Sequence, residues 1–280
     1  MDIIIDWIVA YGKFWLILVM AIGALTIIKE IYSKKNGDRF EKKIVKCVKK
    51  YIKEDAFCNI LIKTGKRWDF TLYDSWKKEP FYESVEETSE IDGAFVSSKG
   101  IFVMECKYRS AHINACDGES TWSMGGGAPE ENYSPLLQND KHIQILTQDL
   151  ERELHTKTYA YNIVVLRAPG THITLNGTRY HDEPFINALI HRKLGILSLV
   201  EKYNYKPRKA FKAFMKEYKL LPDVYSQEEV ALISARLKKL QGTKEERKRH
   251  ANQYHSVEHW TRMQEIDNNY LEKKAKKIKK

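Results

Sequence analysis

Two apolar stretches joined by a short turn constrain the fold of this chain more than any other feature. Residues 90–97 and residues 101–108 both read as strands, and residues 98–100 between them are typical of a turn, so the sequence predicts a β-hairpin. Glu105 and Lys107 are two residues apart on the second strand, which places their side chains on the same face. Because a buried charge is costly unless it has a partner, this hairpin is a candidate for chemistry as well as for structure.

The first strand of the hairpin also carries an acid, Asp92, so two carboxylates and one lysine are expected near one another. The carboxylates of Asp92 and Glu105 suit a hard divalent cation such as Mg²⁺, which takes oxygen ligands and lowers the pKa of a bound water. Lys107 would orient or deprotonate that water, or stabilise an anionic transition state. Two plainer interpretations stay open: Asp92 as a hydrogen-bonding acid at a strand end, and Glu105 with Lys107 as an exposed ion pair.

Helical and strand-like patterns alternate along the rest of the chain and predict an α/β protein. Residues 38–53 have apolar side chains at helical spacing, and Pro135 opens a second helix. Residues 63–88 are polar and aromatic without a clear period and predict an irregular excursion, and residues 109–133 predict a loop. The other expected elements are strands at 57–62, 162–166 and 196–200, a hairpin at 173–180, helices at 185–192 and 206–221, and a capping box that begins at Ser226.

Several motifs follow one another in a fixed order and together resemble a known family. They are Gly37 with Glu41, Ile91-Asp92, the string Gly100-Ile101-Phe102-Val103-Met104-Glu105-Cys106-Lys107, and a helix start Ser134-Pro135 followed by Gln138 and His142. The set resembles the nuclease-related domain (NERD) family of the PD-(D/E)xK restriction-endonuclease-like superfamily, over about residues 36–170. An Asp…Glu-x-Lys pattern arises often by chance, whereas the ordered set with the extended string is specific.

The resemblance implies a restriction-endonuclease-like core, a mixed sheet flanked by helices, that hydrolyses phosphodiester bonds of nucleic acid, DNA rather than RNA. It implies Mg²⁺, or Mn²⁺ in its place, as the cofactor. Asp92 and Glu105 would ligate the metal, with the Cys106 carbonyl as a third ligand, and Lys107 would serve the attacking water.

The same resemblance adds Glu41 and Gln138 to the catalytic set. Glu41 has an alternative role as an acid in a capping box with Asp38, in the first turn of a helix. Gln138 has an alternative role as a polar residue at a helix start. His142 lies one helical turn after Gln138, and either contacts phosphate or is a packed histidine.

The N-terminal segment differs from the rest of the chain. Residues 14–28 contain no charge, and residues 7–28 are long enough, at about 1.5 Å per residue, to span a bilayer as a helix interrupted only by Lys13. Acids precede this span and lysines follow it, so the positive-inside rule predicts a single-pass membrane protein with its N-terminus outside and its nuclease domain in the cytoplasm. A cleaved signal peptide and a buried core helix are the alternatives.

The charge of the chain favours a polyanionic partner. The net charge is +10, and because residues 1–28 carry a net charge of −1, the remaining residues carry +11. The cysteines form no Cys-x-x-Cys pair and predict free thiols in a reducing compartment. The sequence thus predicts a membrane anchor at 1–32, a nuclease domain at 33–205 and a basic helical extension at 206–280, in which His250, His255 and His259 are expected on a solvated face.

Two other classes of function stay open. One is a nuclease-like module that binds nucleic acid without cutting it, and the other is a membrane-tethered scaffold whose cations meet lipid or an acidic protein. The intact set of Asp92, Glu105 and Lys107 argues against the binding module, because degenerate copies of a nuclease tend to lose such residues. The scaffold leaves three ionisable side chains within apolar strands unexplained.

Overall fold

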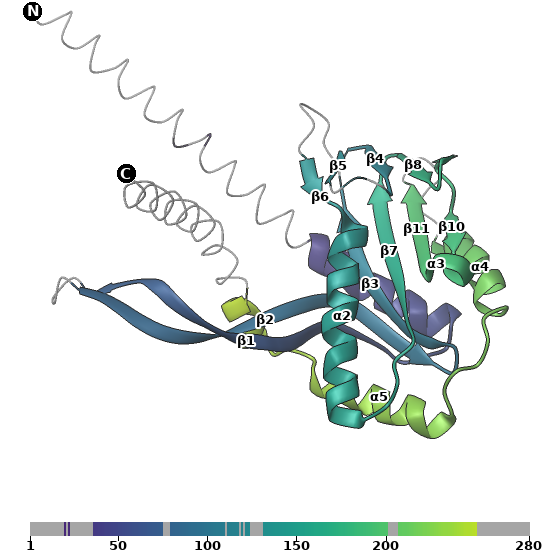
Figure 1. Cartoon of the computed structure of the whole chain (residues 1–280). Coiled ribbons are helices and arrows are strands. Elements are labelled where there is room, and N and C mark those ends of the chain that lie inside the picture. The colour runs from purple at the N-terminus through teal and green to yellow at the C-terminus, as the bar shows by residue number, and fades with distance from the viewer. Residues whose placement is uncertain are drawn as a thin grey trace, which may run out of the picture.

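The computed structural model describes residues 20, 22, 36–74, 79–109, 111–117, 119, 121–123, 131–200 and 207–250 (Figure 1). Within these residues, a six-stranded mixed sheet forms the centre of the molecule, with the strand order β1-β2-β3-β7-β11-β10. The strands are β1 (Ala56–Asp74), β2 (Glu79–Ser97), β3 (Gly100–Tyr108), β7 (Ala160–Ala168), β10 (Phe185–Ala188) and β11 (Leu194–Val200). Strands β3, β7 and β11 are parallel to one another, and the outer pairs are antiparallel.

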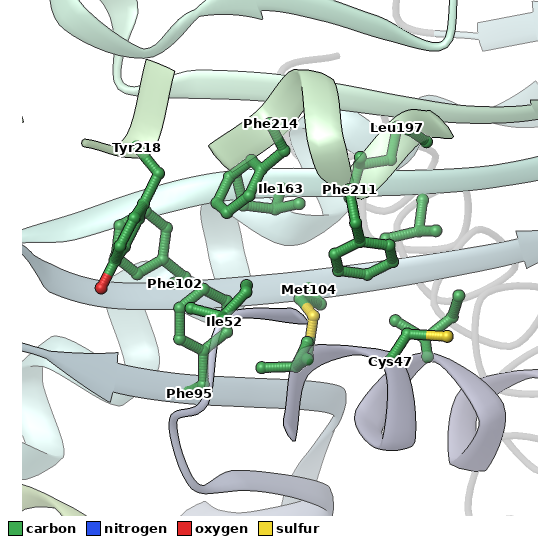
Figure 2. Packing of buried hydrophobic residues seen from close by; sticks show 14 of the residues in the cluster. Cys47, Ile52, Phe95, Phe102, Met104, Ile163, Leu197, Phe211, Phe214 and Tyr218 are labelled. Atoms are coloured by element: carbon green, nitrogen blue, oxygen red, sulfur yellow. The ribbon is translucent and has the colours of Figure 1, made fainter. Parts of the chain in front are cut away.

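Helices cover both faces of this sheet. On one face lie helical residues 36–51 and α4 (Pro207–Tyr218), and on the other lie α2 (Pro135–Leu154) and α5 (Gln227–Lys239). Figure 2 shows the first of these interfaces, where Phe95 and Phe102 from neighbouring strands stack with ring centroids 4.6 Å apart. Phe214 of α4 meets the Phe102 ring nearly at right angles, at 6.0 Å. Alternation along β3 thus directs Phe102 and Met104 to this interface, and leaves the opposite face to Glu105 and Lys107.

A smaller sheet packs against β7 and β11. Its strand order is β6-β5-β4-β8-β9, and its strands are β4 (Ile113–Cys116), β5 (Thr121–Ser123), β6 (Glu131–Tyr133), β8 (Thr171–Leu175) and β9 (Thr178–His181). Trp122 is fully buried there and donates a hydrogen bond from Nε1 to the Cys116 carbonyl at 3.1 Å. The loop predicted for 109–133 is therefore wrong where β4, β5 and β6 form. These strands are too short to show a pattern in the sequence, and they add one after another to β8 through β4.

Strands β1 and β2 extend beyond the sheet as a two-stranded arm (Figure 1). The irregular excursion predicted for residues 63–88 is wrong, because those residues form most of the arm, and the short strand predicted at 57–62 is the base of β1. Irregularities in the strand register between Lys63 and Gly65, and between Asp69 and Leu72, interrupt the alternation of side chains. These breaks removed the two-residue period from which a strand is recognised in sequence.

Most other predicted elements are confirmed. The hairpin of residues 90–108 is the β2–β3 pair, residues 36–51 are helical, and Pro135 is the first residue of α2. The capping box at Ser226 opens α5, and all four cysteines are free. The helix predicted for 185–192 is wrong, because Phe185–Ala188 adds to the sheet beside β11 and only α3 (Leu189–Arg192) is helical.

Both ends of the chain lie mostly outside the described residues. Among the described residues, no helix is long and apolar enough to cross a membrane. The predicted anchor, residues 7–28, lies outside the described residues apart from Met20 and Ile22. The division into 1–32, 33–205 and 206–280 stays a prediction, although α4 and α5 from the third part pack directly on the two faces of the central sheet.

Candidate active site

Asp92 sits where strands β2 and β3 separate. Their backbone pairing ends with Gly93 opposite Met104. At the next residue the side chain replaces the backbone as the acceptor, because Asp92 Oδ2 accepts a hydrogen bond from the Cys106 N–H at 2.7 Å. This bond holds the Asp92 carboxylate beside the part of β3 that carries Glu105 and Lys107. The expectation that the hairpin places these three residues together is therefore confirmed.

Glu105 and Lys107 form an ion pair on the face of β3 that looks toward α2. The Lys107 Nζ lies 2.6 Å from Glu105 Oε1, and the Glu105 side chain is only 1% exposed. Lys107 also donates a hydrogen bond to Gln138 Oε1 at 2.9 Å. Gln138 stands in the first turn of α2, where Pro135 begins the helix, so the helix start delivers this amide to the lysine.

His142 lies one turn further along α2 and faces the same carboxylate. Its Nδ1 is 3.3 Å from Glu105 Oε2, and both side chains are buried. The geometry does not make a hydrogen bond, so within the described part of the chain neither atom has a hydrogen-bond partner. His142 is therefore packed and buried against Glu105, as the second of its two interpretations predicts, and its contact with phosphate stays a prediction. One buried oxygen of Glu105 is left without a hydrogen bond among the described residues.

Negative charge accumulates in this site. Burial raises the pKa of Asp92 well above its usual range, and the neighbouring charges of Glu105 and Glu41 raise it further. Burial, followed by the charges of Asp38, Glu90 and Glu105, raises the pKa of Glu41 to about 7. Burial also raises the pKa of Glu105, but His142 and Lys107 outweigh it and hold that pKa below the ordinary value. Three carboxylates therefore interact with one another, and only one of them keeps its charge readily.

A buried amide network fixes α2 over the sheet. Asn139 donates from Nδ2 to the Val103 carbonyl at 2.9 Å and to Asn162 Oδ1 at 2.8 Å. Asn162, on β7, donates to the Leu136 carbonyl at 2.9 Å and to Asp140 Oδ1 at 2.7 Å. Since Asn139 lies between Gln138 and His142 in sequence, this network sets the position of both side chains over β3. The sequence analysis did not predict a role for Asn139 or Asn162. The available signal was Asn162 itself, a polar amide near the start of the otherwise apolar strand β7.

The predicted site residues fall into two groups. Hydrogen bonds and an ion pair bring Glu105, Lys107 and Gln138 together, with Asp92 held beside them through the Cys106 N–H. Glu41 is connected to this group through charge, since Glu105 raises its pKa and it raises that of Asp92. Cys106 is placed through its backbone N–H, which binds Asp92, while its side chain packs toward the hydrophobic cluster around Phe102. The role of the Cys106 carbonyl as a metal ligand stays a prediction.

The prediction of a solvated face for the C-terminal histidines is wrong for His250. This side chain is only 5% exposed, and its Nδ1 lies 2.7 Å from Thr88 Oγ1 on β2. The error arose because the helix that carries His250 docks on β1 and β2, a long-range contact with no local signal. His255 and His259 lie outside the described residues.

The donor set fits a hard divalent cation with few protein ligands. Within the described ranges, no three His, Cys, Asp or Glu side chains are grouped so that they could hold a metal ion between them. Mg²⁺ does not require such a cage, because it is commonly bound by one or two carboxylates together with waters and substrate phosphates. Glu105 Oε2, which accepts no hydrogen bond from the described residues, and the crowded Asp92 carboxylate supply that kind of incomplete shell.

Comparison with known proteins gives one match. Residues 36–167 match the family model described as nuclease-related domain, NERD. This range runs from the first described helix through β7 and includes every residue of the candidate site named above except the C-terminal His250. No curated protein and no solved structure matches significantly.

Proposed function

Because residues 36–167 belong to the nuclease-related domain family, we propose that this chain is a metal-dependent nuclease that hydrolyses phosphodiester bonds of nucleic acid, with DNA as the favoured substrate. The observation that carries the proposal is the Glu105–Lys107 pair. A carboxylate buried to 1% exposure holds a lysine at 2.6 Å, yet keeps its other oxygen without a hydrogen-bond partner in the described part of the chain. A purely structural ion pair would have both oxygens satisfied.

In this proposal the core is restriction-endonuclease-like, and Asp92 and Glu105 hold Mg²⁺, or Mn²⁺, with the Cys106 carbonyl as a third ligand. When bound, the cation supplies positive charge that lowers the pKa of water and offsets charge developing on the phosphodiester. Charge complementarity supports the assignment. Burial first, and then repulsion from Glu105 and Glu41, raise the pKa of Asp92, and a cation would offset both effects.

Lys107 serves the attacking water. A lysine ammonium has three N–H donors, and Glu105 and Gln138 engage it from two sides, which fixes its direction. The donor left over would orient the water and then stabilise negative charge on the phosphoryl oxygens. Gln138 positions Lys107, and Glu41, with its raised pKa, accepts or returns a proton near the cleaved bond.

The test is cleavage by the purified full-length chain. Labelled single-stranded and double-stranded DNA and RNA are incubated with Mg²⁺, with Mn²⁺, and with a chelator, and the Asp92→Asn protein serves as the control for a contaminating nuclease. The proposal expects metal-dependent products from at least one substrate and none from the control. Tight binding without cleavage of any substrate would instead identify a binding module. If the chain neither binds nor cleaves nucleic acid, the scaffold is the function that remains.

We also propose that residues 7–28 anchor the enzyme in the membrane, with the nuclease domain in the cytoplasm. The uncharged run 14–28 and the lysines that follow it support this topology. A reporter fused after Lys280 is expected to be active in the cytoplasm, and the chain is expected to stay in the membrane fraction after carbonate extraction. A reporter active on the other side would overturn the orientation.

A further inference from the structure

A segment outside the family match docks against the base of the β1–β2 arm. This docking segment, residues 240–250, adds to the edge of β1: Leu61 donates from its N–H to the Leu240 carbonyl at 2.8 Å, and Gly242 donates to the Asn59 carbonyl at 2.8 Å. Gln241 forms an antiparallel bridge with Ile60. The contact is close, since a Cβ built at Gly242 would lie 2.3 Å from Leu61 Cδ1. The backbone of this segment is therefore held in one place.

A capping box then sets the direction of a short helix. The Thr243 N–H donates to Glu246 Oε2 at 2.8 Å, and the Glu246 N–H donates to Thr243 Oγ1 at 3.2 Å. Residues 244–250 are helical, and Figure 1 shows this helix beside the base of the arm. Arg247 and His250, three residues apart, share the face that meets the strands.

Both side chains contact strand residues that neighbour the catalytic acid. Arg247 donates from Nη1 to Asn59 Oδ1 at 2.9 Å. Asn59 lies between the pairs Cys58–Gly93 and Ile60–Ile91, that is, across from Asp92. His250 Nε2 is 3.8 Å from Glu90 Oε2, two residues before Asp92 on the same strand. The docking segment therefore borders the site from the β1 side, whereas α2 borders it from the other.

The guanidinium of Arg247 has more hydrogen-bond donors than these contacts engage. Only one of the five guanidinium N–H donors is bonded to Asn59, and Nε is buried with no hydrogen-bond partner in the part of the chain that the structure describes. The positive charge reaches the site, because it opposes the rise in the pKa of Glu41. Lys107, the other cation of the site, is already engaged by Glu105 and Gln138. Lys107 thus keeps one donor, which the proposed mechanism assigns to the attacking water, whereas Arg247 keeps several donors for a further ligand beside the carboxylates.

We propose that Arg247 binds a phosphate of the nucleic acid strand next to the bond that is cut, and that His250, through Thr88, positions the helix that presents it. This proposal rests on the proposed nuclease function, and it adds a substrate-binding residue from beyond residues 36–167. An arginine suits the task because its planar fork matches phosphate geometry and stays charged at every working pH. It would also shield the substrate from the carboxylates of Glu41 and Asp92.

The test uses full-length proteins with the Lys107→Met change, so that DNA is bound but turned over slowly. Binding of a labelled DNA duplex and of its single strand is measured between about 50 and 200 mM salt with Mg²⁺ present. Arg247→Ala is expected to weaken binding about tenfold or more and to lower the salt slope by about one. Arg249→Ala, which removes the same charge from an exposed position two residues away, is expected to leave the slope close to that of the parent.

A second control separates a phosphate contact from a structural role. Asn59 has a positive φ of 54°, so Asn59→Gly suits the backbone conformation while it removes the partner of Arg247, together with a local hydrogen bond to Cys58 Sγ. Asn59→Gly is expected to bind DNA nearly as the parent does. Equal effects of Arg247→Ala and Arg249→Ala, or a loss of binding in Asn59→Gly equal to that in Arg247→Ala, would overturn the proposal. If the protein without the Lys107 change cuts nucleic acid while Arg247→Ala has no effect, only this inference fails and the proposed function stands.

Discussion

Two buried carboxylates meet helix α2, and their surroundings differ in one respect. Asp149, on α2 itself, is 4% exposed and fully paired: Arg236 of α5 donates to it at 2.9 and 2.8 Å from Nε and Nη2, and Arg152 donates at 2.9 Å. Glu105, on β3, is even more buried. Lys107 binds its Oε1, but its Oε2 has no hydrogen bond among the described residues, although His142 Nδ1 lies 3.3 Å away.

The difference separates a structural charge from a functional one. The guanidinium of Arg236 donates to both carboxylate oxygens of Asp149, so this ion pair joins α5 to α2. No further ligand is needed to satisfy the Asp149 carboxylate. The second oxygen of Glu105, and the crowded Asp92 beside it, are costly in the protein alone. Buried carboxylates that lack protein partners are typical of a site that binds another ligand. Burial alone therefore does not identify an active site; incomplete pairing of the buried charge does.

The largest expected effect comes from the incompletely paired site. Glu105→Gln and Asp92→Asn keep the side-chain shape and remove charge, so metal-dependent cleavage is expected to fall by at least about 10³-fold in each. Their effects on stability in a chelator should have opposite signs. Asp92→Asn is expected to raise the melting temperature, since the raised pKa marks an unfavourable charge, while Glu105→Gln lowers it, since that charge is favourably paired. Cleavage assays and thermal melts measure both, and unchanged cleavage in either protein would remove the carboxylate from the mechanism.

Breaking the complete pair should give the converse result. Asp149→Ala removes both hydrogen bonds of Arg236 to Asp149 and leaves only the longer contact with Glu153 at 3.9 Å, so the free energy of unfolding is expected to fall by about 3 to 5 kcal/mol. Cleavage by the protein that is still folded at low temperature should be unchanged. Arg152→Ala is the matched control, because this side chain is 66% exposed and its loss should cost no more than about 1 kcal/mol. Loss of cleavage in folded Asp149→Ala would make the two carboxylates functionally alike.

Lys107 has both a structural and a proposed catalytic role in this comparison, because it is the ion-pair partner of Glu105 and the group that serves the attacking water in the proposed mechanism. Lys107→Met is expected to reduce turnover by about 10² to 10³-fold while Mg²⁺ and DNA still bind, since lysine is not a metal ligand. Calorimetric titration of Mg²⁺ alongside cleavage measures the two separately. Full activity in this protein would refute the assigned role, and loss of metal binding would show that Lys107 supports the ligand geometry instead.

The sequence predicted the centre of the fold because its signals there were local. Alternating apolar residues around a turn specified the β2–β3 pair, and Asp92, Glu105 and Lys107 followed from the strand period. The arm escaped prediction because shifts in its strand register interrupt the alternation of side chains, although its two strands are neighbours in sequence. Strands β4, β5 and β6 escaped prediction because they are only three or four residues long, and β4 pairs with the distant β8. Phe185–Ala188 likewise became an edge strand through pairing with β11, against its helical pattern.

The same distinction applies to the site. Gln138 and Glu41 were predicted from the family resemblance, and the structure brings them to the hairpin. The Asn139–Asn162 network and the docking of His250 and Arg247 connect residues between 23 and 188 positions apart. No pattern within one element contains such contacts, so a single sequence could not reveal them.

The smallest expected effect concerns Glu41 and its dependence on pH. Its pKa is about 7 in the folded protein and near 4.5 when unfolded, so the folded state binds this proton more tightly. The stability that this proton contributes is complete below about pH 4.5 and is lost as the pH rises through 7. Glu41→Gln cannot ionise, so in a chelator it should match the parent at about pH 4 or below and exceed it at pH 8. The gain should be about 2 kcal/mol, which corresponds to about 4 to 8 °C in melting temperature. Asp55→Asn, which changes the charge of an exposed acid, serves as the control and should show no such trend. A pH-independent difference between Glu41→Gln and the parent would mean that Glu41 does not share the electrostatic environment of Asp92 and Glu105.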